Sequence, residues 1–349
     1  MNPRISVALS ATALLAAPVF LHAQDHAVKL AAKKSWTVPR TPDGYPDLQG
    51  IWSNATLTPM QRPAEFKGKA TISDTEAAVY EKHDLKTNDI DDPEAPLLAR
   101  AGSGSGATAV GGYNNLFIDR GSQLERVDGV KRTSLIIDPP DGMMPPRVPG
   151  SGGMYGRGAG RGGRDGGYNE SDNVKSHPLS ERCLLGFGST SGPPMLPVLY
   201  NNNYQIIETP KAIMILVEMI HDVRVIRMNA THKPPEIRQW LGDSIGHWEG
   251  DTLVVDTTNF TDKTRFMGST EDLHTVERFQ RVDQHTILYR VTIEDPKTWT
   301  RPWTIEYPFL ATKGPIYEYA CHEGNYALDD ILGGADKREE TQGQGAAKR

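Results

Sequence analysis

Residues 240–260 read WLGDSIGHWEGDTLVVDTTNF, and this stretch decides the fold class. Leu253, Val254, Val255 and the two threonines after Asp256 favour an extended backbone. Glu249-Gly250-Asp251 supplies a residue that can adopt the positive φ of a tight turn between two extended runs. The stretch therefore predicts a β-hairpin.

Strand-like runs and turn residues alternate along most of the chain, and only one segment reads as a clear helix. That helix is expected over residues 71–86, where Ser73 and Glu76 stand at capping-box spacing. About a dozen short strands predict an all-β, mainly antiparallel fold, a barrel or a β-sandwich with one or two peripheral helices. The strands expected outside the hairpin are 50–52, 113–119, 133–138, 205–208, 212–219, 224–228, 274–282, 286–293, 303–310 and 316–322.

Residues 1–23 read as a secretory signal peptide, because Arg4 precedes an apolar run and a small residue follows it. A membrane anchor is the alternative, but Pro18 interrupts the run, which is also short for a membrane span. The sequence therefore predicts a periplasmic or secreted protein with no membrane span after cleavage of the signal peptide.

The remainder is expected to form a single β-rich domain over residues 39–330. A flexible lead-in at 24–38 precedes it, and a disordered tail at 331–349 follows it. Long glycine-rich loop insertions are expected near 101–112 and 147–168.

The net charge and the motifs of the sequence limit which classes of partner and cofactor are expected. The formal net charge of the chain is −6, which argues against nucleic acid as a partner. GAGRGG at 158–163 matches the dinucleotide fingerprint in letters only, because no predicted strand precedes it. No cofactor is predicted, the expected partner is a small-molecule ligand or substrate, and the sequence indicates no oligomeric state.

The chain has two cysteines, Cys183 and Cys321. Export places them in an oxidising compartment, so a disulfide is expected rather than two free buried thiols. A zinc site is disfavoured, because isolated cysteines lack the paired spacing of such sites.

Several sequence blocks together resemble a large group of exported bacterial proteins of uncharacterised function. They include PRTPDGYPDLQGIW at 39–52, GDSIGHWEGDTLVVDTTNF at 242–260 and YEYACHEGN at 317–325. The resemblance covers most of the chain after residue 38 and brings no established activity or catalytic residue with it. The Gly50-x-Trp52 pattern also resembles the opening of lipocalin-like barrels, which implies that Trp52 plugs one barrel end. An ordinary buried tryptophan in a sandwich is the alternative.

Charged residues within strand-like runs are the candidates for chemistry, because burying an unpaired charge is costly. Either the charged face of each strand meets solvent and forms ion pairs, or it lines a barrel cavity where histidine can move protons near neutral pH. The candidate catalytic residues are His221, Asp222, Arg224, His247, His322 and Glu323.

Four of these candidates, His221, Asp222, Arg224 and His322, are expected to meet in one pocket. A divalent-metal site with two histidines and one carboxylate is kept as an alternative. No histidine pair has helical spacing, so such a site depends wholly on the fold. Its potential ligands are His221, Asp222, His247, Glu249, His274, His322 and Glu323.

Two functions remain open. The first is an exported enzyme that performs hydrolytic, lyase or isomerase acid–base chemistry on a small organic or sugar-like compound in a barrel cavity. The second is a non-catalytic small-molecule-binding protein of lipocalin-like type. Trp52 and Trp248 are both expected to be core residues, so that Trp248→Ala costs about 3 to 5 kcal/mol.

Overall fold

The hairpin at 240–260 forms part of a closed sheet in the computed structural model. The structure describes residues 36–89, 118–151, 174–176, 179–180, 182–186, 192–220, 222–263, 266–326, 328–334 and 337. The expected signal peptide and the expected insertion at 101–112 lie outside these residues. The same holds for most of the second insertion and for His221.

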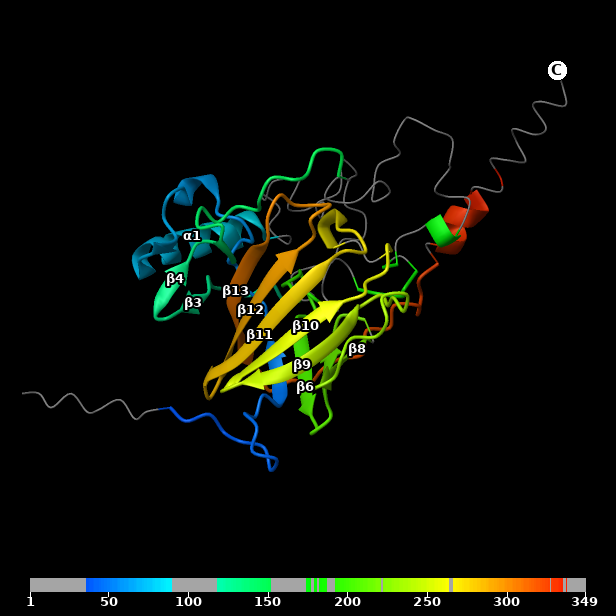
Figure 1. The fold of residues 1–349 in the computed structure, drawn as a ribbon. Coiled ribbons are helices and arrows are strands. Elements are labelled where there is room, and N and C mark those ends of the chain that lie inside the picture. Colours follow the sequence, from blue (N-terminus) through cyan, green and yellow to red (C-terminus); the bar gives the residue numbers. More distant parts are fainter. Residues whose placement is uncertain are drawn as a thin grey trace, which may run out of the picture. The chain divides into compact units, whose positions relative to one another are not determined.

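The strands of the described residues form a closed barrel, which confirms the barrel prediction and excludes the β-sandwich (Figure 1). β1 hydrogen-bonds to β6 on one side and to β13 on the other, and this double pairing closes the ring. β5 (Ile136–Asp138) adds to β13 outside the ring. The barrel strands are β1 (Gly50–Ser53), β6 (Asn203–Glu208), β7 (Ala212–Val217), β8 (Val223–Met228), β9 (Asp243–Glu249), β10 (Thr252–Thr258), β11 (His274–Asp283), β12 (Thr286–Glu294) and β13 (Trp303–Ala311).

The predicted hairpin is β9–β10. Trp248 pairs with Leu253 in the register, and Gly250 begins the turn with φ 60°. Figure 1 shows β9, β10, β11 and β12 as neighbouring long arrows, in agreement with their ladder of antiparallel pairings. The local prediction from Gly250 and the β-branched run is therefore confirmed.

One strand pair in the barrel is parallel. Strand direction reverses at each antiparallel neighbour, so a closed ring with an odd number of strands needs at least one parallel contact. The ring in the described residues has nine strands, and β8 and β9 make the parallel pair. Parallel neighbours need a crossover connection, and residues 229–242 supply it outside the ladder.

Side chains fill the interior of the barrel. Alternate residues of β11, β12 and β13 point inward, as the period of two requires, and they are fully buried. Aromatic rings pack against one another there, as Tyr289 and Phe309 do with centroids 4.9 Å apart. The interior is thus a packed core, and the cavities described below lie at the barrel ends and outer surface. Its large buried side chains include Trp52, Tyr204, Phe279, Tyr289, Trp303, Tyr307 and Phe309.

The helix α1 (Asp74–Thr87) follows the capping-box residue Ser73, so it begins three residues later than the expected range 71–86, and Thr71–Ile72 form a strand instead. The Ser73 hydroxyl accepts from the Glu76 amide at 3.2 Å, and the Glu76 carboxylate accepts from the Ser73 amide at 3.0 Å. The helix packs in a small separate core with Ile72 and Leu124 rather than in the barrel core. Figure 1 shows it beside β3 (Arg126–Val127) and β4 (Val130–Arg132), which form a small sheet with β2 (Thr71–Ile72). Short 3₁₀ helices span Ala64–Phe66, Val174–Ser176 and Phe266–Gly268.

The disulfide between Cys183 and Cys321 is present, with Cα atoms 5.7 Å apart. The strand expected at 316–322 does not form, and residues 312–320 are irregular. The reason is that β13 already pairs with β12 on one side and with β1 and β5 on the other, so no free edge remains for another strand. The disulfide and the bond from the Tyr317 amide to the buried Glu218 carboxylate, at 3.2 Å, hold the segment instead. Residues 328–334 are helical, although the disordered tail was expected to begin at 331.

Candidate functional site

Arg224, a sequence candidate, lies inside the barrel and is paired. Its Nη1 donates to Glu277 Oε1 at 2.9 Å, and its Nη2 donates to Glu277 Oε2. The hydroxyl groups of Ser244 and Thr257 accept from the same guanidinium at 3.2 Å. Arg224 is 2% exposed and Glu277 is 0% exposed. Two buried charges that satisfy each other in this way form a structural ion pair.

The segment around Met195 covers this ion pair. The Tyr289 hydroxyl donates to Glu277 Oε1 at 2.9 Å and accepts from the Met195 amide at 3.1 Å. The Tyr307 hydroxyl donates to the Met195 carbonyl at 2.6 Å. Met195 is itself fully buried, so the network is sealed by the chain. Arg224 therefore stabilises the barrel interior and does not act as an open anion-binding group there.

His247 lies on the outer face of the barrel. Its Nε2 lies 3.2 Å from Glu249 Oε1, and the Arg278 guanidinium donates to the other oxygen of the same carboxylate. All three side chains are about half exposed. For these residues the solvated ion-pair interpretation holds, and such pairs contribute little to stability.

A second chain of charges runs over the outer face from the crossover to β12. His232 Nδ1 lies 3.1 Å from Asp243 Oδ2, and its Nε2 lies 2.9 Å from Asp256 Oδ1. His274 Nε2 lies 3.0 Å from the second oxygen of Asp256, and its Nδ1 lies 3.8 Å from Glu294. Sequence reasoning named His274 but missed His232, which stands outside any strand. The chain of charges holds the crossover against β9, β10 and β11.

The pKa values in this chain of charges follow from its contacts. Burial opposes ionisation of Asp256, but hydrogen bonds from His274 and His232 outweigh it and lower the pKa of that carboxyl. Burial of Asp243 is likewise outweighed by the Lys233 amide, His232 and Arg227, so its pKa is lowered. The hydrogen bond to Asp256 raises the pKa of His274 against partial burial. Among the described residues, no group of three or more His, Cys, Asp or Glu side chains is placed to hold a metal ion.

The remaining candidates separate into two places. Asp222 and Arg224 border a cavity beside the crossover. His322 and Glu323 are exposed and border another cavity with Glu318 and Tyr319. Neither of these two cavities is bordered by both Arg224 and His322. His221, the fourth member of the expected cluster, lies outside the described residues.

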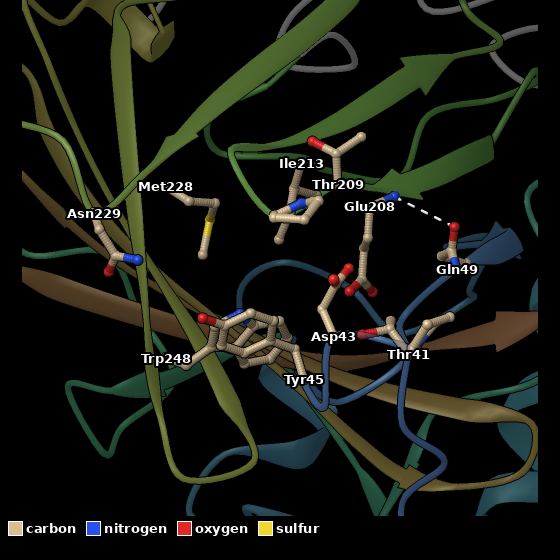
Figure 2. Close-up of a pocket in the computed structure, with 12 residues that line it drawn as sticks. Thr41, Asp43, Tyr45, Gln49, Glu208, Thr209, Ile213, Met228, Asn229 and Trp248 are labelled. Carbon is tan, nitrogen blue, oxygen red and sulfur yellow. Dashed lines mark hydrogen bonds between the residues drawn. The ribbon is translucent and has the colours of Figure 1, made fainter.

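A different pocket lies at the end of the barrel where β6 ends, and it contains a carboxyl with a raised pKa (Figure 2). Its volume is about 320 Å³. The amino-terminal segment 41–49, the β6–β7 hairpin, the end of β8 and the tip of the β9–β10 hairpin meet there. It is lined by Thr41, Pro42, Asp43, Tyr45, Gln49, Glu208, Thr209, Pro210, Ile213, Met228, Asn229 and Trp248.

Glu208 is the titratable group of this pocket. It shares the inward face of β6 with Tyr204 and Ile206, but it lies at the strand end and stays half-buried. Burial is the largest influence on its pKa and raises it, and the neighbouring Asp47 adds to this effect. The Leu48 amide, which donates to Glu208 Oε1 at 2.5 Å, and Arg281 act in the opposite direction, and the resulting pKa is about 7. The carboxyl therefore exchanges its proton close to neutral pH.

Aromatic rings form another wall of the pocket. Tyr45 and Trp248 stack with centroids 5.9 Å apart and an interplanar angle of 13° (Figure 2). The prediction that Trp248 is a core residue holds only in part, because this ring packs against the barrel core but is only partly buried and also lines the pocket. Trp52 is buried as expected, at 2% exposure. Its Nε1 donates to the Leu48 carbonyl at 2.9 Å, and the Arg281 guanidinium lies 5.4 Å from its ring centroid.

Sequence reasoning missed Glu208, Asp43 and Tyr45 as site residues. Alternation along NYQIIE places Glu208 on the same face as Tyr204 and Ile206, and this was the available indication. Asp43 and Tyr45 stand in the turn-forming PDGYPD. This sequence predicts a loop, but it does not indicate which other residues the loop contacts.

The chain was compared with family models, curated proteins and solved structures, and none of the three comparisons gives a match. In the described part of the chain, the helices are too short or too polar to cross a lipid bilayer.

Proposed function

We propose that the protein is an exported enzyme that performs acid–base chemistry on a small, sugar-like compound, with Glu208 as the proton-transferring group. The observation that carries the proposal is a carboxyl of pKa about 7 that borders a pocket. General acids and bases work best when their pKa lies near the working pH. The Cys183–Cys321 disulfide supports export, because such bonds persist in oxidising compartments.

The two oxygens of Glu208 have different surroundings. The Leu48 amide donates to Oε1 and fixes the orientation of the carboxyl group. In the protonated form, Oε2 carries the proton and donates it to a leaving oxygen of the substrate. In the ionised form, the same carboxylate accepts a proton from water or from a substrate carbon. One group thus serves hydrolysis, elimination or isomerisation.

The other walls favour a polar ring as the substrate. The stacked rings of Tyr45 and Trp248 offer apolar faces, which suit the C–H face of a sugar. Asp43, Gln49, Thr41 and Asn229 offer oxygen and nitrogen atoms for hydroxyl groups. Asp43 is a second carboxyl in the same pocket and completes an acid–base pair with Glu208.

The test is a substrate screen with a matched pair of variants. The purified protein is incubated with mono- and disaccharides, sugar acids and sugar lactones, and products are followed by proton NMR. For any compound converted, Glu208→Gln should lower kcat by about 10²- to 10⁴-fold. This variant keeps an oxygen that accepts from the Leu48 amide. Glu236→Gln, on an exposed carboxylate of the crossover, is the control and should leave kcat unchanged.

The pH profile provides a second criterion. The activity of the wild-type protein should titrate with an apparent pKa near 7, which Glu208→Gln should remove. Full activity in Glu208→Gln contradicts the proposed role. Saturable quenching of tryptophan fluorescence by a sugar that is never converted would instead establish the alternative, a non-catalytic small-molecule-binding protein. If no compound in the panel is either converted or bound, both the enzyme proposal and the binding-protein alternative are contradicted.

A further inference from the structure

A second pocket lies beside the parallel pair β8–β9, at the opposite end of β8 from Glu208. Its volume is about 540 Å³, which is in the range of small-molecule sites. Residues from the start of β8, the start of β9 and the crossover 229–242 line it. The proposed activity at Glu208 makes no use of it.

The crossover forms a fixed wall of this pocket. Asn259 Nδ2 donates to the Lys233 carbonyl at 3.0 Å, and the Lys233 amide donates to Asp243 Oδ2 at 2.8 Å. Further along, the Gln239 amide donates to the Asn259 carbonyl at 2.9 Å, and the Thr261 amide donates to the Gln239 carbonyl at 3.1 Å. These contacts join both halves of the crossover to β9 and to the residues after β10. The backbone that carries the lining residues Lys233 and Gln239 is therefore held in place.

Cations outnumber carboxylates in the lining of the pocket, where Asp222 contributes one further carboxylate. Arg224 is paired with Glu277, and Arg227 is neutralised by Asp243, to which its Nη2 donates at 2.9 and 3.0 Å. Lys233 and Arg238 form no ion pair among the described residues. Lys233 Nζ donates to the Gln239 amide oxygen at 3.3 Å, and Arg238 Nη1 donates to the carbonyls of Phe260 and Glu271.

Arg238 presents more donors than it uses. Within the described ranges of the chain, its Nε and Nη2 make no hydrogen bond, whereas its Nη1 makes two. Two carbonyls thus hold the guanidinium in place and leave part of its fork open. A carboxylate is the group that matches such a fork.

The remaining wall of the pocket is apolar and exposed. Val223 and Val225 on the outer face of β8 are 48% and 49% exposed, and Trp240 on the crossover is 40% exposed. Apolar side chains open to solvent beside two cations favour a ligand that has an apolar body and a negative charge.

We propose that this pocket binds a small organic anion with a flat apolar body, of which an aromatic carboxylate is the simplest member. Lys233 and Arg238 hold the carboxylate. Trp240 and the two valines cover the ring. The compound binds without reacting, and its site is separate from the pocket that contains Glu208.

Benzoate is the probe, and its binding to the full-length protein is measured by calorimetry and by tryptophan fluorescence. Benzamide has the same ring without the charge, and acetate has the charge without the ring. Benzoate should bind at least about tenfold more tightly than either. Equal binding of benzoate and benzamide, or no saturable binding of benzoate at millimolar concentration, overturns the proposal.

Variants locate the site. The double substitution Lys233→Gln with Arg238→Gln should weaken benzoate binding about tenfold or more. Lys82→Gln with Lys211→Gln makes the same charge change on exposed lysines elsewhere and should leave the affinity unchanged. Lys233→Gln alone is used if loss of the Arg238 carbonyl contacts unfolds the protein. Unchanged affinity in a folded Lys233 variant contradicts the assignment. Glu208→Gln should not alter benzoate binding, so this test is independent of the proposed activity.

Discussion

Two glutamates point into the same barrel, and their surroundings give them opposite properties. Glu277, in the middle of β11, is fully buried and is held by Arg224 and Tyr289. Glu208, at the end of β6, is half-buried and receives one amide hydrogen bond. The carboxylate of Glu277 is locked by a permanent cation, whereas that of Glu208 gains and loses a proton near neutrality. The comparison shows that the surroundings of a carboxyl within one barrel decide whether it is held in a buried ion pair or has a raised pKa near neutrality.

The largest effect is expected from breaking the locked pair. Glu277→Ala leaves the buried Arg224 guanidinium without its counter-charge, so it should cost about 3 to 5 kcal/mol in the free energy of unfolding. Urea denaturation measures this cost. The double variant Arg224→Met with Glu277→Leu should lose less than the single one, because no buried charge is left unpaired. A cost below about 1 kcal/mol for Glu277→Ala would show that water reaches the pair.

The two tryptophans sharpen the same contrast between interior and barrel end. Trp52→Ala removes a fully buried indole and should cost about 3 to 5 kcal/mol. Trp248→Ala should cost only about 1 to 2 kcal/mol, because this ring is only partly buried where it packs against the barrel core and stacks on Tyr45. Thermal or urea unfolding of both variants tests the difference. Equal costs would place Trp248 in the core after all.

The pH dependence of stability tests the raised pKa of Glu208. Its pKa is about 7 in the folded protein, against an ordinary value of 4.5. A raised folded pKa contributes stability that is fully present below about pH 4.5 and is lost as the pH rises through 7. Glu208→Gln should therefore match the wild type at low pH and exceed it by about 1 kcal/mol at pH 8, after allowance for solvent screening.

Glu125 supplies a comparison for that experiment. It is buried away from the pocket, and burial raises its pKa to about 8. In the wild-type protein, both carboxyls contribute to the pH dependence of the free energy of unfolding. The contribution of Glu208 is therefore the difference between the wild-type protein and Glu208→Gln. A variant that gains nothing between pH 5 and 8 would contradict the raised pKa of Glu208.

The smallest effect is expected on the outer face. The pKa of His274 is raised by its hydrogen bond to Asp256, so its contribution is present below about pH 6.5 and lost as the pH rises through the folded pKa. His274→Asn should cost under about 1 kcal/mol at pH 5.5 and less at pH 9, because the pair is partly solvated. Chemical denaturation at the two pH values measures it, with His247→Asn as the more exposed control. A loss that grows with pH contradicts the protonated state.

The sequence by itself determined the local structure of this protein. β-branched runs define the strands, Gly250 defines the hairpin turn, and Ser73 with Glu76 defines the start of α1, because each depends on residues close in the chain. The disulfide could be predicted because Cys183 and Cys321 have no other cysteine partner within the chain.

Only the tertiary structure decided which face of each strand lies inside and which residues meet. Alternation in β11 separates Glu277 from His274 and Arg278 but does not say which set is buried, since each contains charge. Closure with an odd number of strands requires a parallel pair, whose position no local pattern marks. The Glu208 pocket joins segments near residues 43, 208 and 248, and the anion pocket joins β8 to its crossover. Such contacts depend on closure of the whole sheet, which no single stretch of sequence encodes.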